Sequence, residues 1–168
     1  QRGQYVAVNN LGGISNVTYL PKGSGSAELA AFDTGPANMV LDGLMSRITN
    51  GRASMDREGR LAAKGRVDSR LLAKLLAHPY LSQAPPKSTG REAFGTKMLD
   101  ELLNWQHTRR LSVEDLLATC SRWTAEAVGT ARRWIKGGID DVIVGGGGVR
   151  NRAIMGHLTD IFAPVPVT

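Results

Sequence analysis

The chain has 168 residues, 42% of them hydrophobic, which is enough for one folded domain with a buried core. Lys and Arg (21) outnumber Asp and Glu (15), so the formal net charge is +6. The single cysteine, Cys120, excludes an internal disulfide, and no apolar run approaches the roughly 18 residues of a membrane helix. A membrane protein, a disulfide scaffold and a low-complexity chain are therefore excluded. The start, QRGQYVAVNN, has neither an initiating Met nor a signal peptide, and we expect a longer parent chain.

The first forty residues predict a β-meander. Residues 5–8 and Ile14–Leu20 are β-rich, the second with clear alternation, and a Gly-Gly turn separates them. Residues 21–26, rich in Gly and Ser, predict a loop. A third apolar run at 29–32 predicts a strand that ends in a sharp loop at 33–36.

The middle of the chain predicts helices. Apolar residues recur at helical spacing in four stretches, residues 37–48, 71–76, 94–103 and 113–135. Pro79 ends the second stretch and a Gly-Gly pair at 137–138 ends the fourth. Ser112 with Asp115 has the character of a helix cap, and Cys120 falls on the buried face of that helix.

The chain closes with a strand, a glycine turn and a helix. Residues 141–144 predict a short buried strand, four glycines follow, and Asn151 can cap a final helix through Phe162. With no repeat or linker, the sequence predicts one α/β domain: a β-meander followed by helices and a strand–glycine turn–helix unit.

Two glycine sites and one acidic residue are the candidates for chemistry. The Gly12-Gly13 turn and the run at 145–148 expose backbone that can cradle a phosphate or approach a nucleotide ring; tight turns and close packing are the alternatives. The run at 145–148 has the spacing of neither a Rossmann nor a P-loop motif. Asp33 follows an apolar strand directly, where a carboxylate can act as a base or stabilise its own turn.

Other functional classes receive less support. His78, His107, His157 and Cys120 have no zinc-ligand spacing. Two arginine pairs, at 109–110 and 132–133, accompany the positive charge without a nucleic-acid-binding signature. A scattered basic surface explains them, and a basic nucleic-acid module stays an alternative.

Four motifs occur in order along the chain. They are NLGGISN at 10–16, FDTGPANMVLD at 32–42, PPKSTGRE at 85–92 and VIVGGGGVRN at 142–151. Together they resemble the anhydro-N-acetylmuramic acid kinases, a branch of the actin/hexokinase/Hsp70 superfamily, and the related levoglucosan kinases share the pattern. The resemblance covers nearly the whole chain. It implies an actin/hexokinase-like (ribonuclease H-like) ATPase fold, of which residues 1–168 form the second, C-terminal lobe as a single domain.

The resemblance also implies an activity. Such a kinase uses ATP and Mg²⁺, opens 1,6-anhydro-N-acetylmuramic acid with water and phosphorylates its O6, giving N-acetylmuramic acid 6-phosphate. It implies a cytoplasmic enzyme of peptidoglycan recycling whose partners are ATP and the anhydro sugar, without nucleic acid or membrane; a homodimer is compatible with it. Levoglucosan as substrate, and a non-catalytic nucleotide-binding lobe, stay open as alternatives.

The resemblance assigns roles by position. Asp33 would be the general base that activates water. The remaining site residues form three groups: Asn10, Gly12 and Gly13 in a phosphate loop; Gly145, Gly146, Gly147, Gly148 and Asn151 in an adenosine-binding turn; and Thr34, Gly35 and Asn38 around the sugar. It assigns no metal ligand.

Three features depart from the family pattern. Ala37 stands where the family usually has glycine, so its methyl group narrows the sugar site or packs at a helix start. The chain lacks the family's N-terminal lobe with a first phosphate loop, and it ends before an acidic C-terminal segment. We therefore expect little or no turnover from these 168 residues alone.

Overall fold

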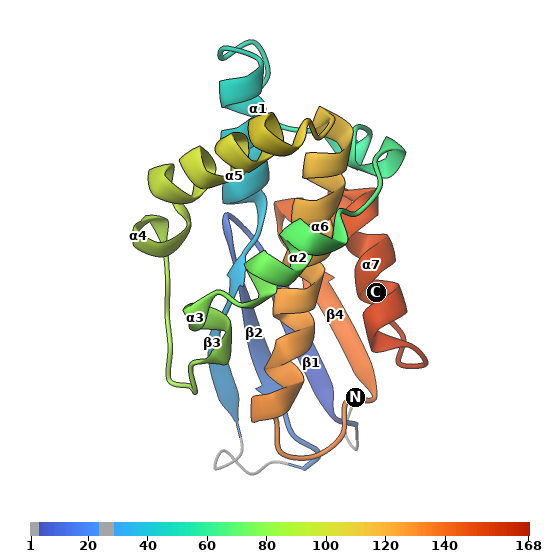
Figure 1. Cartoon of the computed structure of the whole chain (residues 1–168). Helices are drawn as coiled ribbons and strands as arrows, with labels where there is room; N and C mark the ends of the chain where they lie inside the picture. Colours follow the sequence, from blue (N-terminus) through green and yellow to red (C-terminus); the bar gives the residue numbers. More distant parts are fainter. Residues whose placement is uncertain (1–3, 24–28) are drawn as a thin grey trace.

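A four-stranded sheet with helices packed against one face forms the centre of the molecule (Figure 1). The structure, a computed structural model, describes residues 4–23 and 29–168, so the predicted loop at 21–26 lies partly outside the described residues. The strands are β1 (Val6–Leu11), β2 (Ile14–Leu20), β3 (Ala30–Pro36) and β4 (Asp141–Gly145), in the order β3-β2-β1-β4. β1 pairs antiparallel with β2 and parallel with β4, and β2 pairs antiparallel with β3.

The segment between β3 and β4 is mostly helical. Its helices are α1 (Asn38–Ile48), α2 (Ser69–Leu76), α3 (Pro79–Ser82), α4 (Arg91–Phe94), α5 (Thr96–Arg109) and α6 (Val113–Thr130), and α7 (Arg152–Phe162) follows β4. Short 3-10 turns are η2 (Arg57–Gly59), η3 (Ala62–Lys64), η4 (Ala131–Trp134) and η5 (Gly147–Arg150).

Helix α6 crosses the sheet and builds the core (Figure 1). Its residues Leu116, Leu117 and Trp123 are fully buried, and Cys120, buried as predicted, has its thiol pKa raised to about 12 by that burial. The predicted cap is confirmed, since Ser112 Oγ accepts a hydrogen bond from the Asp115 N–H at 3.0 Å. No helix among the described residues is long and apolar enough to cross a membrane.

Several predicted boundaries are wrong. β3 continues through residues 33–36 because Pro36 still pairs with Ile14, so the predicted sharp loop is strand. The helix expected at 94–103 is divided at Gly95, where an added Cβ would overlap the Arg91 carbonyl oxygen, and the long helix ends at Thr130 before η4. The last residues, for which no element was predicted, bridge the outer edge of β4 through a parallel contact between Val167 and Val142.

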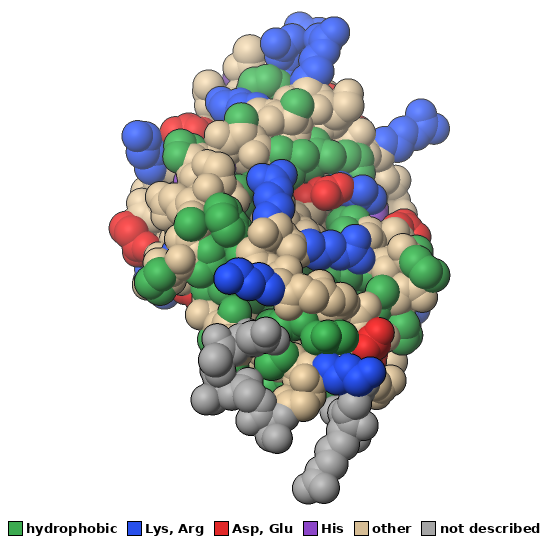
Figure 2. Space-filling view, turned by 90° about the horizontal axis from the view of Figure 1, so that it is seen from below, with side chains coloured by type: hydrophobic (Ala, Val, Ile, Leu, Met, Phe, Trp, Pro, Cys, Tyr) green, Lys and Arg blue, Asp and Glu red, His purple; other side chains and the backbone are tan. Residues whose placement is uncertain are grey.

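Positive charge is spread over the end of the molecule away from α1. On the face seen in Figure 2, at the end of the molecule away from α1, Lys and Arg side chains are interspersed with apolar and uncharged ones. On this face the basic side chains are scattered, as the composition predicted.

Candidate active site

The sheet brings the two predicted glycine sites together. β1 and β4 are parallel neighbours with Asn10 opposite Gly145, so both strands end at the same edge of the sheet. The Gly12-Gly13 turn leaves β1 at that edge, and the glycine run leaves β4 beside it. Ligands in α/β proteins commonly bind at the carboxyl ends of parallel strands.

Close backbone contact holds the second turn against β1. A Cβ atom at Gly148 would lie 2.5 Å from the Leu11 Cβ, and one at Gly146 would lie 2.7 Å from the Leu11 carbonyl oxygen. Gly146 also has φ +86°, which disfavours any other residue. At Gly147, in contrast, the nearest atom to an added Cβ is the Asn38 side-chain nitrogen at 3.9 Å. Two of these glycines therefore serve packing, while Gly147 borders open space.

The start of α1 joins the first turn. The N–H groups of residues 37–39 donate to the Gly12 and Gly13 carbonyl oxygens, each at 3.1 Å. The Asn38 side-chain amide donates to the Leu11 and Gly12 carbonyl oxygens at 3.1 and 2.9 Å. The first amides of α1 are thus occupied within the protein and do not form an anion site.

Uncommitted glycine amides, among them the following three, are available at this end of the sheet. In residues 4–23 and 29–168, the N–H groups of Gly12, Gly13 and Gly146 donate no hydrogen bond. Gly13 and Gly146 are exposed and Gly12 is half-buried. Uncommitted backbone N–H groups on neighbouring turns are suitable donors for phosphate oxygens.

A cavity of about 560 Å³ opens beside Gly147. This volume is typical of small-molecule sites. Its walls come from α1, the segment around η2, and the turn that leads into α7. The lining residues are Asn38, Leu41, Asp42, Met55, Asp56, Arg57, Glu58, Gly147, Arg150 and Asn151.

Asn151 supports this wall by capping α7, as predicted. Its Oδ1 accepts from the N–H groups of Ala153 and Ile154 at 3.1 and 3.2 Å, and the residue is 7% exposed. Gly59 lies so close that an added Cβ would overlap this oxygen. The Asn151 side chain thus holds the start of α7 in place beside the cavity.

Asp42 also lines the cavity, although its sequence pattern predicts no role for it. It lies four residues after Asn38 on α1, and this spacing places both on one helix face. Burial raises the pKa of the Asp42 carboxyl above its ordinary value of 3.8. The two other cavity carboxylates have partners: Asp56 accepts from the Leu61 and Ala62 N–H groups, both at 2.9 Å, and Glu58 forms ion pairs with Arg60 and Arg152 at 3.5 and 3.8 Å.

Asp33 lies on β3, the edge strand, rather than in a loop. One carboxylate oxygen, Oδ2, accepts from the Thr89 N–H at 2.9 Å, and the Asp33 N–H donates to the Lys87 carbonyl oxygen at 3.2 Å. Across the described chain the other oxygen, Oδ1, has no hydrogen-bond partner, and the residue is half-buried. This arrangement fixes the carboxylate and leaves one oxygen able to accept a proton.

The residues after Asp33 are less accessible. Pairing with β2 shifts register here, with Asp33 opposite Asn16 and Gly35 opposite Ser15. The buried Thr34 hydroxyl donates to the Ser15 Oγ at 2.9 Å. Gly35 is buried, with φ +151°, and an added Cβ would lie 3.1 Å from Ala127. Of the three residues assigned to the sugar, only Asn38 lines the cavity.

The described part of the chain holds no metal-binding cluster of its own. Within the residues the structure describes, no three His, Cys, Asp or Glu side chains converge as a metal site would require. Ala37, the departure from the family pattern, is fully buried at the start of α1, where its methyl group packs.

The whole chain matches one protein family. Residues 1–168 match the model of the family described as anhydro-N-acetylmuramic acid kinase. The chain belongs to this family. It is 40% identical over 166 residues to the anhydro-N-acetylmuramic acid kinase of Clostridioides difficile (strain 630), covering 96% of this chain and 42% of the relative. The kinase of Salinibacter ruber is 45% identical over 161 residues, covering 94% and 40% respectively.

The chain thus spans about two fifths of the length of the curated anhydro-N-acetylmuramic acid kinases it matches. Two solved structures confirm the fold class, an actin/hexokinase/Hsp70-like fold. The activator of the 2-hydroxyisocaproyl-CoA dehydratase from Clostridium difficile, with bound ADPNP, gives a TM-score of 0.56 at 13% identity over 95% of this chain and 51% of its own. Component A of the (R)-2-hydroxyglutaryl-CoA dehydratase from Acidaminococcus fermentans gives a TM-score of 0.54 at 20% identity. The match covers 99% of this chain and 54% of that structure's chain.

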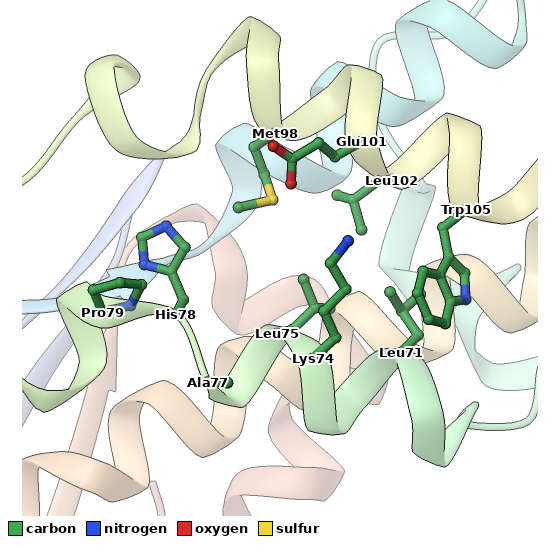
Figure 3. A pocket seen from close by; sticks show the side chains of 10 residues that line it. All are labelled: Leu71, Lys74, Leu75, Ala77, His78, Pro79, Met98, Glu101, Leu102 and Trp105. Atoms are coloured by element: carbon green, nitrogen blue, oxygen red, sulfur yellow. The ribbon is translucent and has the colours of Figure 1, made fainter.

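This chain has a separate pocket of about 200 Å³ between α2 and α5 (Figure 3). Lys74 from α2 and Glu101 from α5 lie on facing sides of an apolar floor. His78, at one end, caps α3 by accepting from the Tyr80 N–H at Nδ1 (3.2 Å) and packs on the Phe94 ring, with centroids 4.9 Å apart. Burial lowers the pKa of His78, and Glu101 partly opposes that shift.

The glycine turn gives a matched pair of variants. We expect Gly148→Ala to lower the free energy of unfolding by about 1–3 kcal/mol, because its Cβ overlaps the Leu11 Cβ, which cannot rotate away. Gly147→Ala, which meets no such atom, should change it by less than about 0.5 kcal/mol. Urea unfolding followed by circular dichroism measures both, and equal losses would contradict the close packing on Leu11.

The lowered pKa of His78 predicts that the folded state loses stability in acid. Because its pKa is lowered on folding, the stabilisation by neutral His78 is present above the ordinary value near 6.5 and is lost as the pH falls below it. We expect His78→Asn, which keeps a capping acceptor but cannot titrate, to reduce the loss of unfolding free energy between about pH 7.5 and about pH 5.5. His107→Asn, at an exposed position, is the control. The same pH dependence in both variants would show that His78 does not contribute.

Proposed function

We propose that the protein containing this chain is an ATP-dependent kinase acting on 1,6-anhydro-N-acetylmuramic acid in the cytoplasm. Two glycine turns meet beside a ligand-sized cavity in a member of the anhydro-N-acetylmuramic acid kinase family, and this observation carries the proposal. The chain would form the second lobe of the kinase, and a first lobe would complete the cleft. The 168 residues alone would then turn over little or no substrate.

The nucleotide would occupy the cavity beside Gly147. The bare backbone of Gly145 and Gly147 allows a flat ring to approach, while Gly148 and Asn151 hold the turn in place. Phosphate oxygens would accept hydrogen bonds from the uncommitted glycine amides at 12, 13 and 146. Asn10 is exposed at the end of β1, with its Oδ1 beside Gly146, so it would border the phosphates.

Mg²⁺ fits this site as an ion carried mainly by the nucleotide. Kinases usually hold Mg²⁺ through substrate phosphates, water and one or two carboxylates, which agrees with the absence of a three-ligand cluster from the described residues. Asp42 is the cavity carboxylate that could contribute. The ion would supply neutralisation of phosphate charge.

Asp33 would act as the general base. Its Oδ1 would take a proton from water as the water oxygen attacks the anomeric carbon and the bond from that carbon to O6 breaks. O6 would then take the γ-phosphoryl group of ATP, whose bond to the β-phosphate breaks, and ADP would leave. Only five residue steps separate Asp33 from Asn38, so their Cα atoms are at most about 18 Å apart. Thr34 and Gly35 would shape the sugar site by fixing the strand, and Asn38 would connect it with the cavity.

Nucleotide binding by this chain tests the cavity. We expect calorimetry to give a Kd for Mg·ADP between about 1 µM and about 1 mM. Gly147→Val should weaken binding at least about tenfold because its side chain enters the cavity, whereas Gly156→Val, at another open glycine on α7, should not. Asp33→Asn should leave binding unchanged. Equal affinities for the two valine variants would place the nucleotide elsewhere.

Turnover is tested in a complete kinase. We would replace the matching 166-residue segment of the Clostridioides difficile relative with this chain and assay both anhydro sugars. We expect phosphorylation of 1,6-anhydro-N-acetylmuramic acid in preference to levoglucosan, and a kcat loss of about 10²-fold or more in Asp33→Asn. Asp100→Asn, an exposed carboxylate on α5, is the control.

The parent relative serves as the positive control for this chimera. Preference for levoglucosan would transfer the assignment to the levoglucosan kinases. A folded chimera that binds Mg·ADP yet phosphorylates neither sugar would support the non-catalytic nucleotide-binding lobe instead.

A further inference from the structure

One segment covers the free edge of the sheet and contacts Asp33 directly. After α3 the chain runs along β3 before it reaches α4 (Figure 1). Residues 85–90 of this segment, the edge strap, belong to the third sequence motif, for which the proposed reaction gave no role. β3 pairs with β2 on its inner side only, so its outer edge needs such cover.

The edge strap and the residue Tyr80 together make three hydrogen bonds to Asp33. The Thr89 N–H donates to the carboxylate Oδ2 at 2.9 Å, and the Asp33 N–H donates to the Lys87 carbonyl oxygen at 3.2 Å. The Tyr80 hydroxyl donates to the Asp33 carbonyl oxygen at 2.9 Å. Backbone and side chain of Asp33 are therefore held from one direction.

The Lys87 side chain ties the strap to α3. Its Nζ donates to the Tyr80 carbonyl oxygen at 3.1 Å and lies 4.6 Å from the centre of the Tyr80 ring and 5.9 Å from that of Phe32. A half-buried lysine over two rings, with a backbone acceptor, is a stable arrangement. The lysine is thus turned toward the protein.

Tyr80 is itself firmly anchored. It is 5% exposed and its ring meets Phe94 edge-on at 5.7 Å, and Phe94 meets Trp123 of α6 in the same way. Burial, with help from Asp33 and Glu92, raises the pKa of Tyr80 to about 12, so its hydroxyl remains a donor at neutral pH. The contacts to Asp33 are therefore connected to the core through Tyr80.

We propose that Tyr80 and Lys87 are positioning residues that lock the edge strap across β3 and so orient the Asp33 carboxylate, with Oδ2 held and Oδ1 open to the water it activates. This inference rests on the proposed function of Asp33 as general base. The orientation of a catalytic base affects the reaction rate strongly, because a displacement of the base by about 1 Å can lower the rate about 10²-fold.

Amide hydrogen exchange in this chain tests the lock without any activity. We expect Tyr80→Phe and Lys87→Met each to speed exchange of the Asp33 and Thr89 N–H groups by about tenfold while β2 amides stay unchanged. Lys74→Met is the matched control, because Lys74 also lies over an aromatic ring, 5.2 Å from the centre of Trp105, but within the described chain it makes no hydrogen bond to the strap or to Asp33. Unchanged exchange at Asp33 and Thr89 in both strap variants would overturn the proposal.

The chimeric kinase described above tests the catalytic consequence. We expect Tyr80→Phe and Lys87→Met to lower kcat by about 10- to 100-fold with the KM for Mg·ATP unchanged, and Lys74→Met to leave both unchanged. A simple loss of folded protein would lower the active fraction equally for all substrates and would speed exchange throughout the chain.

Two kinetic results would count against the proposal in distinguishable ways. Full kcat in both strap variants, together with inactive Asp33→Asn, would overturn the positioning role and leave the proposed base intact. Full activity in Asp33→Asn would overturn the base, and with it the positioning role.

Discussion

The parallel pairing of β1 with β4 is the interaction on which the candidate site depends. It sets Asn10 opposite Gly145, and from that register both following turns emerge side by side. A shift of one residue would reverse which faces the side chains of β4 occupy, and Val142 would leave the core. The close approach of Gly148 to Leu11 confines the register further, since only a residue without a side chain fits there.

Glycine performs two different tasks at this edge. At Gly146 and Gly148 the absence of a side chain lets the turn after β4 pack on β1. A Cβ atom at either position would push the ends of β1 and β4 apart. At Gly12 and Gly13 the carbonyl oxygens hold the start of α1 while the N–H groups stay available. The same residue type thus builds the frame and presents hydrogen-bond donors.

Much of the local structure could be predicted from the sequence. The alternation in Ile14–Leu20 and the caps at Ser112 and Asn151 depend on neighbouring residues, and all three are confirmed. The family suggested by four motifs is confirmed as well. The prediction that Asp33 lies in a loop is wrong. Residues 33–36 pair with β2, and the local sequence pattern does not show that partner strand. The catalytic and binding roles assigned by position stay predictions.

The sequence by itself determined where most strands and helices lie, though not all their boundaries, since caps, turns and periodicity act over a few residues. Only the tertiary structure decided which glycines are packed and which are open, and that Asp42 shares a cavity with Gly147. It also decided that the edge strap holds Asp33 through the Thr89 N–H. These are contacts between backbone and side-chain atoms far apart in the chain, and their partners are chosen by how the layers pack, which no local pattern records.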